Sequence, residues 1–374
     1  MNNEMLTYWK SISELLKWKY YEKNSLILDI LYKQKMSFEE FFNLSNSDKK
    51  EIYGLSDESI KAVSDIYPMI PAVAFEIESL NKQGIDIITL NDPSYPASLK
   101  NLLKKHAPTI LYSKGNKSLL NERIAAVVGS RDVSEKGFLF TKNITKRCVE
   151  NNLVISSGYA RGVDKVALET ALQYNGKSIA VIPQGILTFK SDLKKLYVPI
   201  IEGKVLVMSI FPPDAPWTVG RAMERNKYIY SLAESVYVAE AGDRGGTWSG
   251  AIEGLKAKQD VYVRYAEPEE KCANNKLIAL GARPVDMGGN LVNAIDIPLE
   301  GEALLEDRLP QIIKTLEEKP MDAKQMKEMF ELDITPNLLV RRLKDIPVVN
   351  WTMKNKNIYF YVGREREFDQ ISFL

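Results

Sequence analysis

Short apolar runs that end in glycine-containing loops recur through the middle of the 374-residue chain. The runs are 110–112, 124–128, 153–156, 178–182, 205–208, 235–238 and 260–263. They have the length of buried strands, and helical stretches such as 137–151 and 164–174 separate them. Continuous apolar strands that alternate with helices predict a mostly parallel sheet covered on both faces. Such sheets bind ligands at the carboxyl ends of the strands, where the strand order reverses.

The chain is expected to divide into three domains. Residues 1–84 predict an N-terminal helical (SAM-like) domain, with a capping-box pattern at Ser37 and Glu40 and a helix over 72–83 that ends at Gly84. Residues 85–298 predict an extended Rossmann-like core with a parallel or mixed sheet, in which 85–90 is a further strand. Residues 299–374 predict a small winged-helix-like domain, built from helices over 304–317, 322–330 and 335–344 and a hairpin over 348–351 and 358–362.

Composition excludes several classes of protein. The net charge is +1, so overall charge gives no argument for nucleic acid. There is no apolar stretch of membrane-spanning length and no secretory leader pattern, which favours a cytoplasmic protein with no membrane partner. Two distant cysteines indicate neither disulfides nor a metal site, and no cofactor motif is present. The only histidine is His106, in a polar loop, so the commonest acid–base catalyst is missing and a non-enzymatic role is expected.

The loops after the predicted strands contain small and basic residues suited to holding phosphate. Glycine lets the backbone approach a ligand, main-chain amides at a helix start donate to an anion, and arginine grips a phosphate with two parallel hydrogen bonds. The candidates are Gly129, Ser130, Arg131, Ser157, Gly158, Arg161, Gly162, Arg225, Asn226, Lys227, Asn275 and Lys276. Taken singly, each loop is equally an ordinary turn with a solvent-facing cation. Asp164 is expected to cap a helix rather than to act as an acid or base.

The order of these elements resembles the DprA/Smf family, the DNA-processing proteins of bacterial natural transformation. The matching elements are Tyr95-Pro96, Gly129-Ser130-Arg131, the loop from Ser157 to Asp164, Arg225-Asn226-Lys227 and the stretch from Asn275 to Ala282. The resemblance implies a Rossmann-like fold that binds single-stranded DNA, forms a homodimer and loads the RecA recombinase. It also implies that Arg131 and the Arg225-Asn226-Lys227 cluster hold phosphates.

The chain departs from the family pattern at several positions. Leu168 stands near a place where the family has histidine, and Ala222-Met223 replace a phenylalanine-proline pair. The second change removes an aromatic platform for a base, a contact worth about 1–3 kcal/mol per base. Trp217 and Trp248 are candidate replacements, although a buried tryptophan is the equal alternative.

Two other readings stay open. Gly245-Gly246-Thr247 followed by Glu253 faintly resembles the phosphate loop of phosphoribohydrolases, so a nucleotide-binding sensor or a phosphoribohydrolase-like enzyme is the main alternative. A divergent scaffold that uses its end domains for protein contacts is the other. The last segment, 300–374, carries 14 acidic and 12 basic side chains, which favours a protein-interaction or structural role there over DNA binding.

Overall fold

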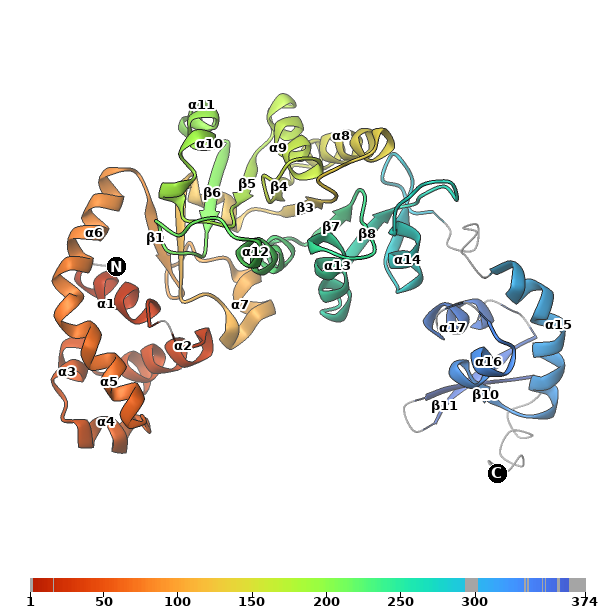
Figure 1. Ribbon diagram of the computed structural model, residues 1–374, viewed down its shortest axis with the longest axis horizontal. Helices are drawn as coiled ribbons and strands as arrows, with labels where there is room; N and C mark the ends of the chain where they lie inside the picture. The colour runs from red at the N-terminus through yellow and green to blue at the C-terminus, as the bar shows by residue number, and fades with distance from the viewer. Residues whose placement is uncertain are drawn as a thin grey trace.

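The computed structural model describes residues 3–15, 17–292, 302–332, 334, 336–344, 346, 348–354 and 357–362. The first part of the chain is helical, as the sequence predicts (Figure 1). Its helices are α1 (Asn3–Ser13), α2 (Tyr20–Leu28), α3 (Phe38–Asn43), α4 (Asn46–Tyr53), α5 (Asp57–Ile66) and α6 (Ile70–Lys82). In the described residues, no helix is both long and apolar enough to cross a bilayer.

Polar caps fix where these helices begin. The Ser37 hydroxyl accepts from the Glu40 amide at 3.2 Å, and the Glu40 carboxylate accepts from the Ser37 amide at 2.7 Å, which is the expected capping box at the start of α3. At the start of α5 the Ser56 hydroxyl accepts from the Ser59 amide at 3.2 Å. The apolar faces of these helices bury Trp9, Ile12 and other side chains in one cluster with residues of the neighbouring sheet.

The middle of the chain forms one mixed sheet with helices on both faces. Its strands are β1 (Asp86–Thr89), β2 (Ile110–Gly115), β3 (Ile124–Val128), β4 (Val154–Ser157), β5 (Ser178–Val181), β6 (Val205–Ser209), β7 (Ser235–Val238), β8 (Asp260–Arg264) and β9 (Arg283–Val285). Within the described residues the nine strands lie in the order β1-β2-β6-β5-β4-β3-β7-β8-β9. Strands β3 to β9 pair in parallel, and β2 is antiparallel to both β1 and β6.

The helices between these strands are α7 (Ala97–Leu103), α8 (Glu135–Glu150), α9 (Val163–Gln173), α10 (Lys190–Lys195), α11 (Tyr197–Ile201), α12 (Val219–Leu232), α13 (Gly246–Lys256) and α14 (Asn274–Ala279). The chain builds β3 to β6 toward one side, and α12 then crosses back to β7 on the other side of β3. The strand order therefore reverses between β3 and β7, which is where this class of fold binds ligands.

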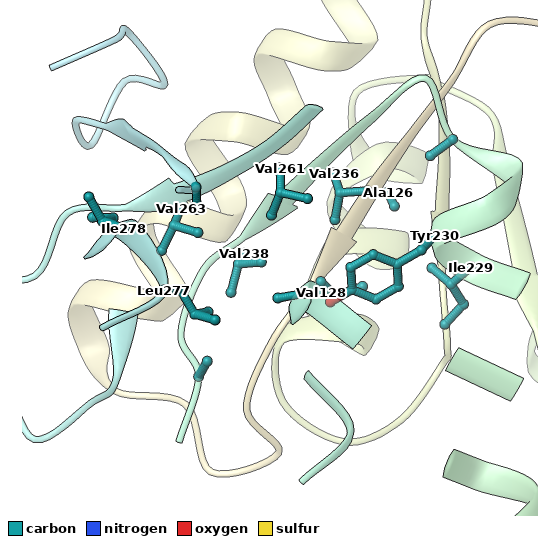
Figure 2. Packing of buried hydrophobic residues seen from close by; sticks show 14 of the residues in the cluster. Ala126, Val128, Ile229, Tyr230, Val236, Val238, Val261, Val263, Leu277 and Ile278 are labelled. Carbon is teal, nitrogen blue, oxygen red and sulfur yellow. The ribbon is translucent and has the colours of Figure 1, made fainter. Parts of the chain in front are cut away.

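Strand β3 shows why both faces of the sheet are covered. Ala125 and Val127 are buried among side chains that include Phe140 of α8, whereas Ala126 and Val128 are buried on the opposite side, with Ile229 and Tyr230 of α12. Figure 2 shows the second cluster, in which Val236, Val238, Val261 and Val263 from β7 and β8 meet the same helix and Leu277 and Ile278 of α14. A strand buried on both sides has no polar alternation, which explains its continuous apolar sequence.

The last described segment has its own small core. It contains α15 (Glu302–Glu318), β10 (Met321–Asp322), α16 (Ala323–Met329), α17 (Pro336–Lys344), β11 (Asn350–Lys354) and β12 (Asn357–Tyr361). The three strands pair in the order β10-β12-β11. Three helices and the hairpin match the prediction, and their interpretation as a winged-helix-like domain stays a prediction. Thr335 and the tip of the hairpin at 355–356 lie outside the described residues.

The predicted fold class is confirmed, and some details differ. The three-residue strand β9 was not predicted, because Pro284 breaks the apolar run and proline is rare within strands. The antiparallel pairing of β2 also has no signal in the strand sequences. The boundary between 84 and 85 falls between α6 and β1, and the boundary at 298/299 lies outside the described residues, so the division into domains stays an interpretation.

The two faces of α8 provide a test of the packing. Replacing Phe140 with alanine removes a fully buried ring and should lower the free energy of unfolding by about 3–5 kcal/mol. Phe138, two residues earlier on the same helix, is 41% exposed, so Phe138→Ala should cost no more than about 0.5 kcal/mol. Urea denaturation of both variants measures the difference, and equal losses would contradict the packing described for α8.

Candidate functional site

Backbone hydrogen bonds join the loops that follow β3, β4 and β7. The Ser130 amide donates to the Glu240 carbonyl at 2.8 Å, and the Ser130 carbonyl accepts from the Val163 amide at 3.1 Å. Ser130 thus connects the end of β7 to the start of α9. The three loops form one frame at the carboxyl edge of the sheet, at the reversal of strand order.

Two glycines allow these loops to approach one another closely. Gly162 has a φ of +83°, and a Cβ atom at this position would overlap the carbonyl oxygens of Ser130 and Arg131. A Cβ on Gly158 would overlap the Arg225 guanidinium and the Asp164 carboxylate. Both positions therefore require glycine. Gly162 requires it for its backbone conformation and its close contacts, and Gly158 for its close contacts alone. Each glycine thus lets two parts of the frame lie in close contact.

Arg225 lies inside this frame and is 3% exposed. Its Nη1 donates to the Gly158 carbonyl at 2.6 Å and also to the Val181 carbonyl, and its Nε donates to the Asn226 side chain at 3.2 Å. Burial lowers the pKa of Arg225 to about 10 despite the nearby Asp164 carboxylate. Burial raises the pKa of Asp164, whereas Arg225 and the hydrogen bonds that the carboxylate accepts lower it. The pair supports the loop after β4 from within.

The three residues Arg225, Asn226 and Lys227 do not form one surface. Asn226 packs against Gly246 at the start of α13. Lys227 lies on the side of α12 that faces the N-terminal helices, where it lines a cavity of about 1550 Å³ with Glu224 and residues of α1, α2 and α5. The three side chains therefore point in different directions, as consecutive residues of a helix do, and their role in holding phosphate stays a prediction.

Two arginine side chains lie over aromatic rings beside the frame. Arg131 is exposed, and its guanidinium carbon lies 6.0 Å from the centre of the Trp217 ring, which is 46% exposed. Arg221, in the first turn of α12, lies 5.7 Å from the ring of Phe211 and donates to the Pro216 carbonyl at 2.5 Å. These residues follow β3 and β6, and we call them the arginine–tryptophan patch: exposed Arg131 and Trp217, half-buried Arg221 and buried Phe211.

Arg161 is also exposed, and it pairs with Asp132 of the loop after β3. Both side chains are largely open to solvent, at 75% and 85% exposure, so this contact contributes little to stability. Ser157 is buried and donates from its hydroxyl to the Val127 carbonyl at 2.6 Å. Of the residues in the loop from Ser157 to Gly162, Arg161 thus has the most accessible side chain.

Asn275 and Lys276 lie on α14, which follows β8, two strands away from β3. The Asn275 side chain donates to the Ala266 carbonyl at 2.7 Å and accepts from the Ala266 amide at 3.1 Å, so it holds a local turn. Lys276 is exposed. The structure does not bring either residue into contact with the loops after β3 and β4. The preceding residue, Asn274, makes the link to β7, because it accepts from the Ala241 amide at 2.9 Å.

Solvent exposure shows whether several other side chains belong to the core or to the surface. Leu168 is buried on α9, so the place of the family's histidine belongs to the core here. Trp248 is partly buried against the core, whereas Trp217 is open. His106 is exposed and packs edge-on against Tyr21, among the N-terminal helices. In the part of the chain that the structure describes, no three His, Cys, Asp or Glu side chains are grouped to hold a metal ion.

Comparison with known families gives a match over the same region. A family model described as "DNA recombination-mediator protein A" matches residues 86–296, more than half of the chain. DNA processing protein DprA of Streptococcus pneumoniae is 36% identical over 181 residues, which are 48% of this chain and 63% of that protein. Protein Smf of Escherichia coli is 32% identical over 185 residues, 49% of each chain. The matched region thus spans less than two thirds of both relatives.

A solved structure supports the same comparison. The X-ray structure of DNA processing protein A from Streptococcus pneumoniae superposes with a TM-score of 0.61 at 28% sequence identity. The alignment covers 77% of this chain and 96% of that chain. The structural alignment thus covers more of this chain, 77%, than the sequence alignment with the S. pneumoniae relative, which covers 48%.

The buried carboxyl group of Asp164 predicts a pH dependence of stability. Because its pKa is raised in the folded chain, the stabilising contribution is complete below the unfolded value of 3.8 and is lost as the pH rises through the folded value. The free energy of unfolding of the wild type, relative to Asp164→Asn, should therefore fall with rising pH above 3.8. Urea denaturation between about pH 4 and pH 7 measures this difference.

Asp132→Asn is the matched control, since that carboxylate is on the surface of the same frame. Its stability should run parallel to that of the wild type across the pH series. Parallel curves for Asp164→Asn and the wild type would contradict the assignment of a buried carboxyl group with a raised pKa.

Proposed function

The chain belongs to the DNA recombination-mediator protein A (DprA/Smf) family, and on that premise we propose that it binds single-stranded DNA at the carboxyl edge of its sheet, without cutting it. The observation that carries the proposal is the arginine–tryptophan patch. It combines the exposed indole of Trp217, after β6, with the exposed guanidinium group of Arg131, on the loop after β3, where the strand order reverses.

The chemistry of the patch suits a single strand better than a duplex. Bases of a single strand expose their faces, so Trp217 can stack on one, whereas the stacked bases of a duplex are covered. Arg131 can donate two hydrogen bonds to a neighbouring phosphate while it stays close to the ring. Neither stacking nor phosphate contact depends on the identity of the base, so the proposed binding has little sequence preference.

The remaining loop residues have supporting roles in this proposal. Gly129, Ser130, Gly158 and Gly162 set the backbone path that presents Arg131, and buried Arg225 holds the loop after β4. Arg161 is a further phosphate contact, because its pairing with exposed Asp132 is easily exchanged for a phosphate.

A role in recombination follows from the family and extends the proposal to partners. We infer that the chain forms a homodimer and places a RecA-type recombinase on the bound strand. The family description, a recombination-mediator protein, supports this inference. In this role the protein acts by binding and delivery, and no step requires a covalent change in the DNA.

Binding of a fluorescent oligo-dT should depend on Trp217 and Arg131 of the patch. Trp217→Ala removes a stacking surface and should weaken binding by about 1–3 kcal/mol, or about 5- to 150-fold. Arg131→Ala should also reduce the steepness of the salt dependence, because each phosphate contact contributes about 0.7 to the slope of log K against log salt for single strands. Fluorescence anisotropy across a salt series measures both effects.

Arg283→Ala is a matched control for this experiment. Arg283 also lies over an aromatic ring, at 5.6 Å from the centre of Tyr262, but it stands at the start of β9 and so at the opposite edge of the sheet. Its replacement should leave oligo-dT binding unchanged. No binding by the wild type at low salt, or equal loss in all three variants, would refute the proposed site.

The partner proposal has a separate test. Light scattering should give twice the mass of the chain, and the protein should shorten the lag before RecA hydrolyses ATP on DNA coated with single-strand-binding protein. A Trp217→Ala, Arg131→Ala double variant should keep the dimer mass and lose the effect on the lag. A monomer, or an unchanged lag with DNA binding intact, would exclude the respective partner.

A further inference from the structure

The start of α8 is the place where a doubly wound fold would hold a nucleotide. Helix α8 follows β3, the strand at the reversal of strand order, and in dinucleotide-binding proteins the pyrophosphate sits at the N-terminus of that helix. Free main-chain amides and the positive end of the helix dipole attract the phosphate. The occupant of this position therefore decides whether the fold can take a nucleotide.

In this chain the position is filled by the carboxylate of Glu240, which follows β7. The side chain accepts from the Ser134 amide, at 3.2 Å to Oε2, and from the Ser134 hydroxyl. Ser134 is the N-cap of α8, and its hydroxyl in turn accepts from the Gly137 amide at 3.1 Å. A Cβ on Gly137 would lie 2.7 Å from Oε2, so the first turn of α8 fits closely around the carboxylate.

A buried cation also faces this carboxylate. Arg264 is 1% exposed, and its Nη2 lies 4.0 Å from Glu240 Oε2 and 2.7 Å from Glu270 Oε2. Glu240 itself is 9% exposed. Its main-chain carbonyl accepts from the Ser130 amide, so the residue is held at both ends.

The charge around the helix start also opposes a nucleotide. Lys136, in the first turn of α8, pairs with Glu267 and lies 3.7 Å from both Glu269 and Glu270. Among the described residues, the ion pairs at this helix start contain more carboxylates than cations. The carboxylates are those of Glu240, Glu267, Glu269 and Glu270, and the cations are Arg264 and Lys136. An acidic surplus repels phosphate groups.

We propose that Glu240 is a specificity-determining residue whose carboxylate takes the place of a ligand phosphate and so closes the switch-point site to nucleotides. The nucleotide-binding alternative then lacks its usual phosphate site, and the arginine–tryptophan patch is left as the anion-binding surface. This inference does not depend on DNA binding, since it concerns the Ser134 cap and the first turn of α8 rather than the side chains of Arg131 and Trp217.

Removal of the carboxylate should create a site for a small anion. Inorganic phosphate should raise the Tm of Glu240→Ala in a saturable way, by about 3 °C at ten times its Kd, relative to sodium chloride of equal ionic strength. The wild type should show no such phosphate-specific rise. Glu240→Gln, which removes the charge but keeps the volume, should also show none, because the space stays filled.

Glu253→Ala, which removes an exposed carboxylate from α13, controls for a general loss of negative charge. If Glu240→Ala folds poorly, its refolding yield in phosphate against chloride replaces Tm, and a higher yield in phosphate supports the proposal. An equal response of Glu240→Ala and the wild type overturns it. An equal rise in Glu240→Ala and Glu240→Gln also overturns it, because the response then does not come from the vacated space.

Discussion

The pair of backbone hydrogen bonds at Ser130 is the constraint on which the rest of the site depends. Through one bond to Glu240 and one to Val163, it ties together loops that arrive from β3, β4 and β7. Backbone bonds between parallel strand ends leave little freedom for the side chains that follow. Arg131 is the next residue, so its position over Trp217 is a product of this frame rather than of its own contacts.

Much of the fold could be predicted because its signals are local. Buried strands such as β3 have apolar sequences, and Ser37 with Glu40 marks a helix start from side chains alone. The strand order and the antiparallel β2 have no such local signal, since they depend on which strand edges meet in three dimensions. Strand β9 was not predicted for a different reason, because Pro284 has no amide proton and proline is atypical of a strand.

The candidate site was only partly predictable, and Arg225 shows why. A basic residue in a polar stretch of sequence is typical of a phosphate contact. The environment of Arg225, however, depends on Gly158 and Asp164, which are more than 60 residues away. Glu240 was missed for the same reason, because its partner Ser134, at the start of α8, is more than 100 residues away. Its sequence signal was a lone carboxylate at the end of an apolar strand run, 235–239, where a buried charge needs a specific partner.

Helix α12 links two regions of the molecule that the sequence treats as separate. One side of it carries Arg225 and Asn226 into the loop frame, and the other carries Glu224 and Lys227 to the cavity beside the N-terminal helices. A helix is stiff along its length, so its two sides cannot rotate independently. Asn226 and Lys227 are therefore held at a fixed angle to each other, and α12 ties the loop frame to the N-terminal helices.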